Sequence, residues 1–150
     1  MRTENKVLIV QAQFYEQITH NLRSGAELEL KKEKISSEII TVPGVFEIPA
    51  AINLFINSNP ENNSLKSYLG VIALGCVIRG ETDHYEHICR ETTRALMDLT
   101  IKYRLPFGFG VLTVENYDQA MTRADPRGGK NFGGKAAQAC LKMIKLKKVS

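Results

Sequence analysis

Two histidines stand three residues apart in "GCVIRGETDHYEHICRE", residues 75 to 91. Helical zinc pairs are normally four residues apart, as in H-E-x-x-H, so the spacing of His84 and His87 does not favour a metal site. On a helix, His84 aligns with Ile88 and faces the strand ends, whereas His87 aligns with Glu91 and Arg94 on the polar side. His84 could be a structural, hydrogen-bonded residue, but a histidine in a cleft also suits proton transfer near neutral pH. We favour acid–base catalysis by His84 and expect His87 to be an exposed bystander.

The residues before His84 have the composition of a helix start. Gly80 lets the backbone approach a ligand, and Thr82 or Asp83 can cap the helix. The unpaired N–H groups and the positive end of the helix dipole favour an anion such as phosphate. Most helices begin with such residues for capping alone, so the pattern is weak evidence by itself. Arg123 and Lys130 could approach the same anion, although each could equally be a solvated surface charge.

Other candidate residues follow the ends of apolar runs. Glu47 is either a first-turn acid that complements the helix dipole or an acceptor for ligand hydroxyls. Phe14 either covers the core or presents a ring face on which a planar group could stack, and Phe109 poses the same choice. Each residue alone leaves both interpretations open.

The elements that must position these residues alternate along the chain. Apolar runs rich in Val and Ile, typical of strands covered on both faces, alternate with runs in which apolar residues recur every three or four positions. This order predicts a single α/β domain over residues 1–150, a three-layer α/β/α sandwich with a four-stranded parallel sheet. We expect strands at 6–13, 34–42, 68–78 and 106–114, and helices at about 15–33, 46–56, 83–103, 116–124 and 134–146.

Ligands of parallel α/β folds bind beyond the carboxyl ends of the strands. The unusual residues of this chain gather there, at 13–14, 42–47, 76–84 and 111–115. They indicate a site for a phosphorylated, hydroxylated and partly planar ligand beside one histidine. Two functions remain open: an enzyme that uses His84 for proton transfer, or a domain that binds or senses a nucleotide-like ligand. Replacing His84 would abolish turnover in the first case and weaken binding in the second.

Composition disfavours several other classes of protein. The chain has 150 residues, of which 43% are hydrophobic and 24% charged, as expected of a soluble globular domain. Much of the excess positive charge lies in "KMIKLKKVS", which we interpret as a solvated helix end and not as a nucleic-acid surface, because aromatic residues are not interleaved. The N-terminus "MRTENKVLIV" has no apolar stretch of signal-peptide length, and no run in the chain approaches the length of a membrane span, so we expect a cytoplasmic protein without membrane contact.

The three cysteines do not form a recognisable functional group. Cys76, Cys89 and Cys140 are far apart in apolar surroundings, and no C-x-x-C pair is present. We expect three reduced, mostly buried thiols.

Three longer motifs occur in a fixed order: "VPGVFEIPAAI", "GCVIRGETDHYEHI" and "PFGFGVLTVENYDQAMTRAD". Together they resemble lumazine synthase over nearly the whole chain. That family condenses 5-amino-6-(D-ribitylamino)uracil with 3,4-dihydroxy-2-butanone 4-phosphate to give 6,7-dimethyl-8-ribityllumazine, phosphate and water in riboflavin biosynthesis, without a metal or organic cofactor. The resemblance implies a flavodoxin-like fold and the same transferase reaction for this chain.

The resemblance also implies a role for individual residues. His84 matches the family's acid–base histidine, and Arg123 would steady the departing phosphate. The loop "RADPRGGKNFGGKAA" carries about one extra residue relative to the family pattern, so we place the phosphate-side lysine at Lys130, with Lys135 as its rival. The other implied contacts are Phe14 on the pyrimidine ring, Val45, Phe46 and Glu47 on the ribityl chain, backbone groups of Cys76, Val77 and Ile78 on the ring edge, Glu81 and Thr82 on the phosphate, and Phe109 in the completed pocket.

Members of the family assemble as pentamers, with each active site between neighbouring subunits. By the resemblance, Phe14, Glu47 and His84 would come from one chain and Phe109 and Arg123 from the next, so an isolated subunit should be inactive. Some members stack twelve pentamers into a hollow shell. The few residues before the first strand and the altered loop favour a free pentamer here, and riboflavin synthase is a further expected partner.

Overall fold

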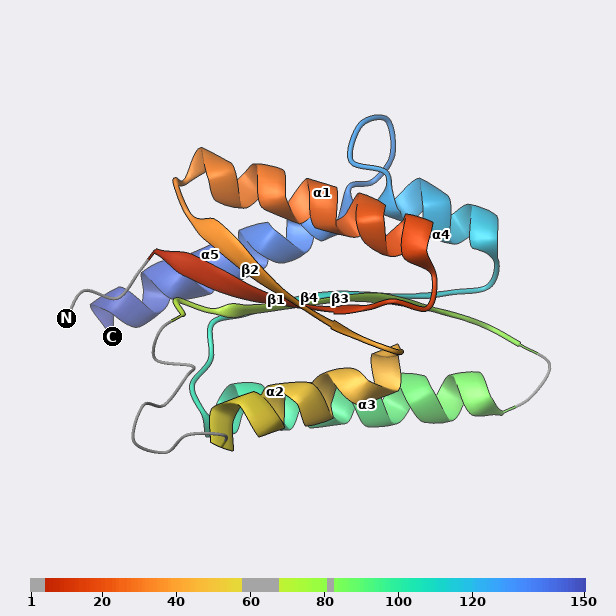
Figure 1. Cartoon of the computed structure of the whole chain (residues 1–150), viewed down its shortest axis with the longest axis horizontal. Helices are drawn as coiled ribbons and strands as arrows, with labels where there is room; N and C mark the ends of the chain where they lie inside the picture. The colour runs from red at the N-terminus through yellow and green to blue at the C-terminus, as the bar shows by residue number, and fades with distance from the viewer. Residues whose placement is uncertain (1–4, 58–67, 81–82) are drawn as a thin grey trace.

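The computed structural model describes residues 5–57, 68–80 and 83–150. Its centre is a four-stranded parallel sheet in the order β2-β1-β3-β4, with helices on both faces (Figure 1). This order matches the first four strands of the flavodoxin-like order, so the predicted fold is confirmed. The elements are β1 (Lys6–Ala12), α1 (Glu16–Lys32), β2 (Ser36–Val42), the 3-10 helix η1 (Val45–Glu47), α2 (Ile48–Asn57), β3 (Val71–Ile78), α3 (His84–Lys102), β4 (Phe107–Val114), α4 (Tyr117–Ala124) and α5 (Phe132–Val149).

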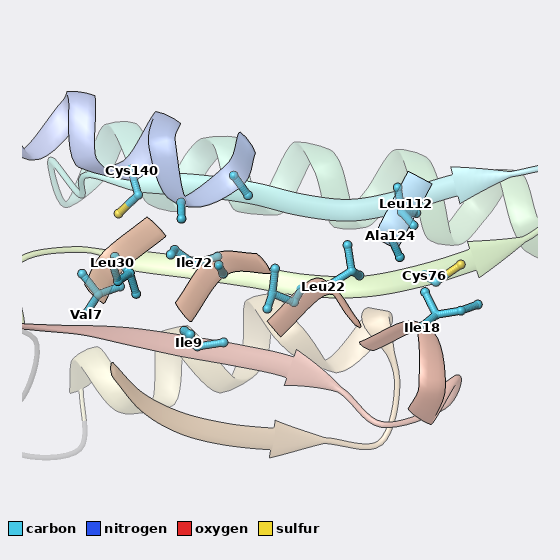
Figure 2. Packing of buried hydrophobic residues seen from close by; sticks show 14 of the residues in the cluster. Val7, Ile9, Ile18, Leu22, Leu30, Ile72, Cys76, Leu112, Ala124 and Cys140 are labelled. Carbon is cyan, nitrogen blue, oxygen red and sulfur yellow. The ribbon is translucent and has the colours of Figure 1, made fainter. Parts of the chain in front are cut away.

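Two apolar cores hold the helices on the sheet. One core packs α1, α4 and α5 on one face, and the other packs α2 and α3 on the opposite face (Figure 1). The repeat predicted for α1 is buried, and Figure 2 shows Ile18, Leu22 and Leu30 in the same cluster as Ile9 of β1 and Ile72 of β3. Burial of these one-sided helices confirms the three-layer sandwich. Within the described ranges, no helix is long and apolar enough to cross a membrane.

The cysteines follow the sequence prediction closely. Cys76 and Cys140 are buried and Cys89 is partly buried, and all three are free thiols. Cys76 and Cys140 both belong to the core beneath α1 and α5, where Figure 2 shows them near opposite ends of the cluster. They are therefore packing residues of one apolar layer.

The boundaries on both sides of β2 differ from the prediction. The second strand begins two residues later than expected, because Lys34 adopts a left-handed φ of 56° that turns the chain after α1. The helix predicted at 46–56 is divided, with η1 preceding an α2 that begins at Ile48. The N–H of Glu47 donates to the carbonyl of Gly44 at 3.2 Å, and this tighter turn redirects the chain before the α-helix begins.

The last helix begins two residues earlier than predicted. Asn131 caps it, and its side-chain oxygen accepts a hydrogen bond from the N–H of Gly134 at 3.1 Å. Gly133 lies directly against α1, where a Cβ atom would collide with the backbone carbonyl of Leu22. The glycines that suggest a loop in the sequence instead allow α5 to approach α1 closely.

The strand order creates a crevice between β1 and β3. The chain leaves β1 through α1 on one face of the sheet and leaves β3 towards α3 on the other (Figure 1). Connections that diverge to opposite faces leave a gap beyond the carboxyl ends of the two strands. The fold therefore predicts a binding site at this edge.

Candidate active site

A cleft of about 400 Å³ opens at the carboxyl ends of β1 and β3. Its walls come from the residues after β1, the turn after β2, and the end of β3 together with the first turns of α3. The lining residues are Phe14, Tyr15, Gly44, Val45, Phe46, Glu47, Cys76, Val77, Ile78, His84 and Ile88. All but Tyr15, Gly44 and Ile88 were named from the sequence as site residues, so the cleft brings together most of the predicted set.

Phe14 presents its ring to the cleft. The side chain is 74% exposed and meets Tyr15 edge-on, with ring centroids 4.9 Å apart. The chain beneath it is fixed by the hydroxyl of Thr19, which donates to the carbonyl of Ala12 at 2.8 Å. A ring this open favours stacking on a planar group over the interpretation that it covers the core.

The turn at 44–47 is anchored by one apolar side chain. Val45 is 6% exposed and occupies a gap that Gly75 leaves in β3, since a Cβ on Gly75 would lie 2.7 Å from Val45 Cγ2. Phe46, at 59% exposed, and the half-buried Glu47 are left facing the cleft. Gly75 therefore explains how a short turn presents an aromatic ring and a carboxylate together.

The end of β3 forms the floor of the cleft. Burial raises the pKa of the Cys76 thiol to about 12, so the thiol stays protonated at neutral pH and is a poor nucleophile. Val77 is buried in the opposite core and Ile78 is half-buried. These three residues therefore offer the ligand shape and backbone groups, and no titrating side chain.

His84 is the first residue of α3 and is exposed at the cleft, one turn before the half-buried Ile88. This confirms the predicted alignment of the two side chains. His87 is exposed and is not among the lining residues, as predicted. Over 5–57, 68–80 and 83–150, no group of three His, Cys, Asp or Glu side chains is placed to hold a metal ion.

The helix start before His84 is described in part. Asp83 occupies the N-cap position, but its side chain makes no capping hydrogen bond, and the N–H of His87 donates to its carbonyl at 3.2 Å. A Cβ built on Gly80 meets nothing within 4 Å, so open space lies beside this backbone. Glu81 and Thr82, the residues expected to bind phosphate, lie outside the described residues.

Comparison with known proteins identifies the family. The family model for 6,7-dimethyl-8-ribityllumazine synthase matches residues 4–148. The chain belongs to the 6,7-dimethyl-8-ribityllumazine synthase family. The protein of that name from Bartonella tribocorum is 53% identical over 148 residues, which cover 99% of this chain and 93% of that protein. Those from Paramagnetospirillum magneticum and Agrobacterium fabrum are each 46% identical, over 95% of this chain and 95% and 94% of their own lengths.

Membership of the lumazine synthase family decides between the two functions that the residues left open. It confirms the predicted resemblance and an enzyme of riboflavin biosynthesis, in place of a domain that only binds or senses a ligand. The cleft described above lies where a flavodoxin-like fold is expected to bind its ligand.

Three residues expected at the lumazine synthase site do not line the cleft. Phe109 lies on the outer strand β4, which is separated from β1 by β3, and is 38% exposed. Arg123 is half-buried on α4, on the opposite face from α2 and α3. Lys130 precedes α5 and is exposed, and so is its rival Lys135 within that helix. A single chain thus brings together one part of the predicted site and leaves the other part elsewhere on its surface.

Proposed function

We propose that this cleft binds the pyrimidine substrate of lumazine synthase and that His84 transfers the protons of the condensation. The observation that carries the proposal is the meeting of Phe14, Glu47 and His84 in one cleft of about 400 Å³. An open aromatic face, a carboxylate and an imidazole suit a planar ring, a polyhydroxyl chain and a reaction with several proton transfers. The substrates are 5-amino-6-(D-ribitylamino)uracil and 3,4-dihydroxy-2-butanone 4-phosphate.

The reaction proceeds in three stages. The 5-amino group adds to the ketone of the butanone and loses water to form an imine. Phosphate is then eliminated, and the ribityl-bearing amine closes the ring with loss of a second water. Each stage adds or removes protons at nitrogen, carbon or oxygen, so one histidine that alternates between acid and base contributes about 10²- to 10⁴-fold. Holding two substrates in register supplies a further part of the acceleration.

The proposed contacts follow the walls of the cleft. Phe14 stacks on the pyrimidine ring, and Glu47 accepts hydrogen bonds from the ribityl hydroxyls beside Val45 and Phe46. Arg123 steadies the departing phosphate through charge-assisted hydrogen bonds. The remaining proposed contacts are the backbone groups of Cys76, Val77 and Ile78 on the ring edge, Glu81 and Thr82 with Lys130 on the phosphate, and Phe109 at the side of the pocket.

We also propose that a second subunit completes each site. The described cleft is lined by residues of one chain that include neither Phe109, on the outer strand β4, nor Arg123, near the end of α4. A head-to-tail arrangement of copies would bring β4 and α4 of one chain to the cleft of the next, and such arrangements close into rings. We favour a free pentamer over a sixty-subunit shell, riboflavin synthase as a partner, and a cytoplasmic location.

Single-turnover formation of the lumazine product, followed by its absorbance, tests the proposal. Wild type and His84→Ala are compared with both substrates supplied. We expect product from the wild type and a rate about 10²-fold or more lower in the variant. Similar rates would reduce His84 to a positioning residue. An intact wild-type assembly that gives no product above the uncatalysed rate would overturn the proposal.

A further inference from the structure

Arg79, which directly follows β3, joins three parts of the fold beside the cleft. Its Nε lies 3.0 and 3.2 Å from the two carboxylate oxygens of Glu115, which follows β4. Its Nη1 donates to Glu86 at 3.2 Å, and its guanidinium lies over the ring of Tyr85, 4.5 Å from the centroid. Tyr85 and Glu86 belong to the first turn of α3. We call Arg79, Tyr85, Glu86 and Glu115 the Arg79 cluster.

Further contacts hold both sides of this cluster on the sheet. The N–H of Arg79 donates to the carbonyl of Val114 at 2.9 Å. Tyr85 is half-buried and packs against the apolar core beneath α2 and α3. His84 is the chain neighbour of Tyr85 in the same helical turn, and a turn of α-helix moves as one body. The contacts of Tyr85 and Glu86 therefore contribute to the position of His84 relative to the strand ends.

The cluster is better suited to fix a geometry than to raise stability. Arg79, Glu86 and Glu115 are all substantially exposed, and exposed ion pairs add little to the free energy of unfolding. Arg79 contacts two carboxylates and one ring at once, which requires the planar fork and the flat face of a guanidinium. Arg79 is also absent from the lining of the cleft, so any effect on the reaction passes through other residues.

We propose that Arg79 is a positioning residue for His84, holding the start of α3 on the ends of β3 and β4. This inference rests on the proposed function, in which His84 transfers protons to and from the substrates. Loss of the cluster lets the imidazole move relative to Phe14 and Glu47, which lowers the rate of proton transfer. The affinity for the pyrimidine substrate is retained because its proposed contacts come from Phe14, the 44–47 turn and strand β3, whose pairing with β1 and β4 does not depend on the cluster.

Arg94 provides a matched control on the same helix. It is exposed and pairs with Glu91 and Asp98 at 3.1 Å, but both partners lie within α3, so these pairs cannot hold the helix to the sheet. We expect Arg79→Gln to lower kcat about tenfold or more, with less than about a twofold change in KM for the pyrimidine substrate. Arg94→Gln should have the kcat and KM of the wild type.

The kcat of Arg79→Lys should be close to that of Arg79→Gln. A wild-type kcat for Arg79→Lys would overturn the proposal, because the positive charge alone would then suffice.

A double-mutant cycle separates this inference from the proposed function. In the His84→Ala background, Arg79→Gln should cause no further loss of kcat, because the residue through which it acts is gone. An equal loss in both backgrounds would overturn the positioning role. A wild type without product, or an active His84→Ala, would instead contradict the proposed function.

A readout that does not depend on turnover completes the test. In NMR spectra of the assembled protein with labelled histidine, Arg79→Gln should change the ring shifts of His84. It should leave His20, which lies on α1, unchanged. Arg94→Gln should move neither signal. A His84 signal that is the same in Arg79→Gln and wild type would count against the proposal.

Discussion

Glu47 is the half-buried carboxylate of the cleft. Its contribution to binding the ribityl-bearing substrate can be measured separately from the binding of the butanone phosphate. A hydrogen bond to a charged group contributes about 1.5–3 kcal/mol. We therefore expect Glu47→Gln to raise KM for the ribityl-bearing substrate by about 10- to 100-fold, while KM for the butanone phosphate changes little. Steady-state kinetics with each substrate varied in turn measures both constants. Equal increases in the two constants would indicate a general distortion of the 44–47 turn.

Two buried thiols make the free energy of unfolding depend on pH in the alkaline range. Burial raises the pKa of Cys76 and of Cys140 from 9.0 to about 12. Above pH 9 the unfolded chain loses these protons while the folded chain keeps them, so the free energy of unfolding falls as the pH rises from about 9 towards 12. Below pH 9 the two states bind the same protons and the effect vanishes. At pH 10 the loss is on the order of 1 kcal/mol for each thiol.

Cys140→Ser tests this linkage. The Cys140 Sγ lies 3.7 Å from the carbonyl of Pro106, and serine retains a donor there without ionising. Urea unfolding at pH 8 and pH 10 should show a pH-dependent loss smaller by about 1 kcal/mol in the variant than in the wild type. The same loss in both proteins would show that the thiol does not remain protonated in the fold.

At the scale of elements, the contact between α1 and α5 depends on Gly133. A side chain there meets backbone atoms of Leu22, which cannot rotate away. We expect Gly133→Ala to lower the free energy of unfolding by about 1–3 kcal/mol, as overpacking typically does. Gly128→Ala is the matched control, because its nearest neighbour would be Asp125 Oδ2 at 3.9 Å. Equal stabilities of the two variants in urea unfolding would show that the helices can separate without cost.

The elements that the sequence predicts well are those whose burial repeats regularly. The strand predicted at 68–78 follows from a continuous apolar run and is observed as the buried Val71–Ile78, and the helix that carries Ile18 and Leu22 follows from apolar periodicity. The boundaries at Lys34 and Gly133 were not predictable in this way. One depends on a left-handed backbone and the other on contact with a helix far away in the sequence.

The same distinction applies to the site. Residues that follow strand ends could be predicted, because parallel strands bring their carboxyl ends to one edge. Arg79 could not, since its contacts with Glu86 and Glu115 exist only once β3, β4 and α3 are assembled. A charged residue at a strand end with an acidic residue seven positions later is too common a pattern to indicate such a cluster.

At the scale of the whole molecule, the sheet order divides the proposed site. Phe14 follows the inner strand β1, whereas Phe109 lies on the outer strand β4, and Arg123 lies on α4 across the sheet from α3. Residues so separated in one chain can meet across an interface that joins unlike surfaces of two copies. The proposed site therefore predicts that activity belongs to an assembly of copies.

Mixing two inactive variants tests this division directly. His84→Ala and Arg123→Ala each remove one half of the proposed site, and we expect both pure assemblies to lose most of their activity. When the two are unfolded together and reassembled at equal amounts, about a quarter of the interfaces pair an intact His84 with an intact Arg123 from the neighbouring subunit. Activity should then return to about a quarter of the wild-type value, while an unmixed blend of the pure assemblies stays inactive. Arg127→Ala, an exposed arginine in the loop after α4, should be active without mixing. Reassembled mixtures that remain inactive, although each variant assembles normally, would place both residues in sites built by one chain.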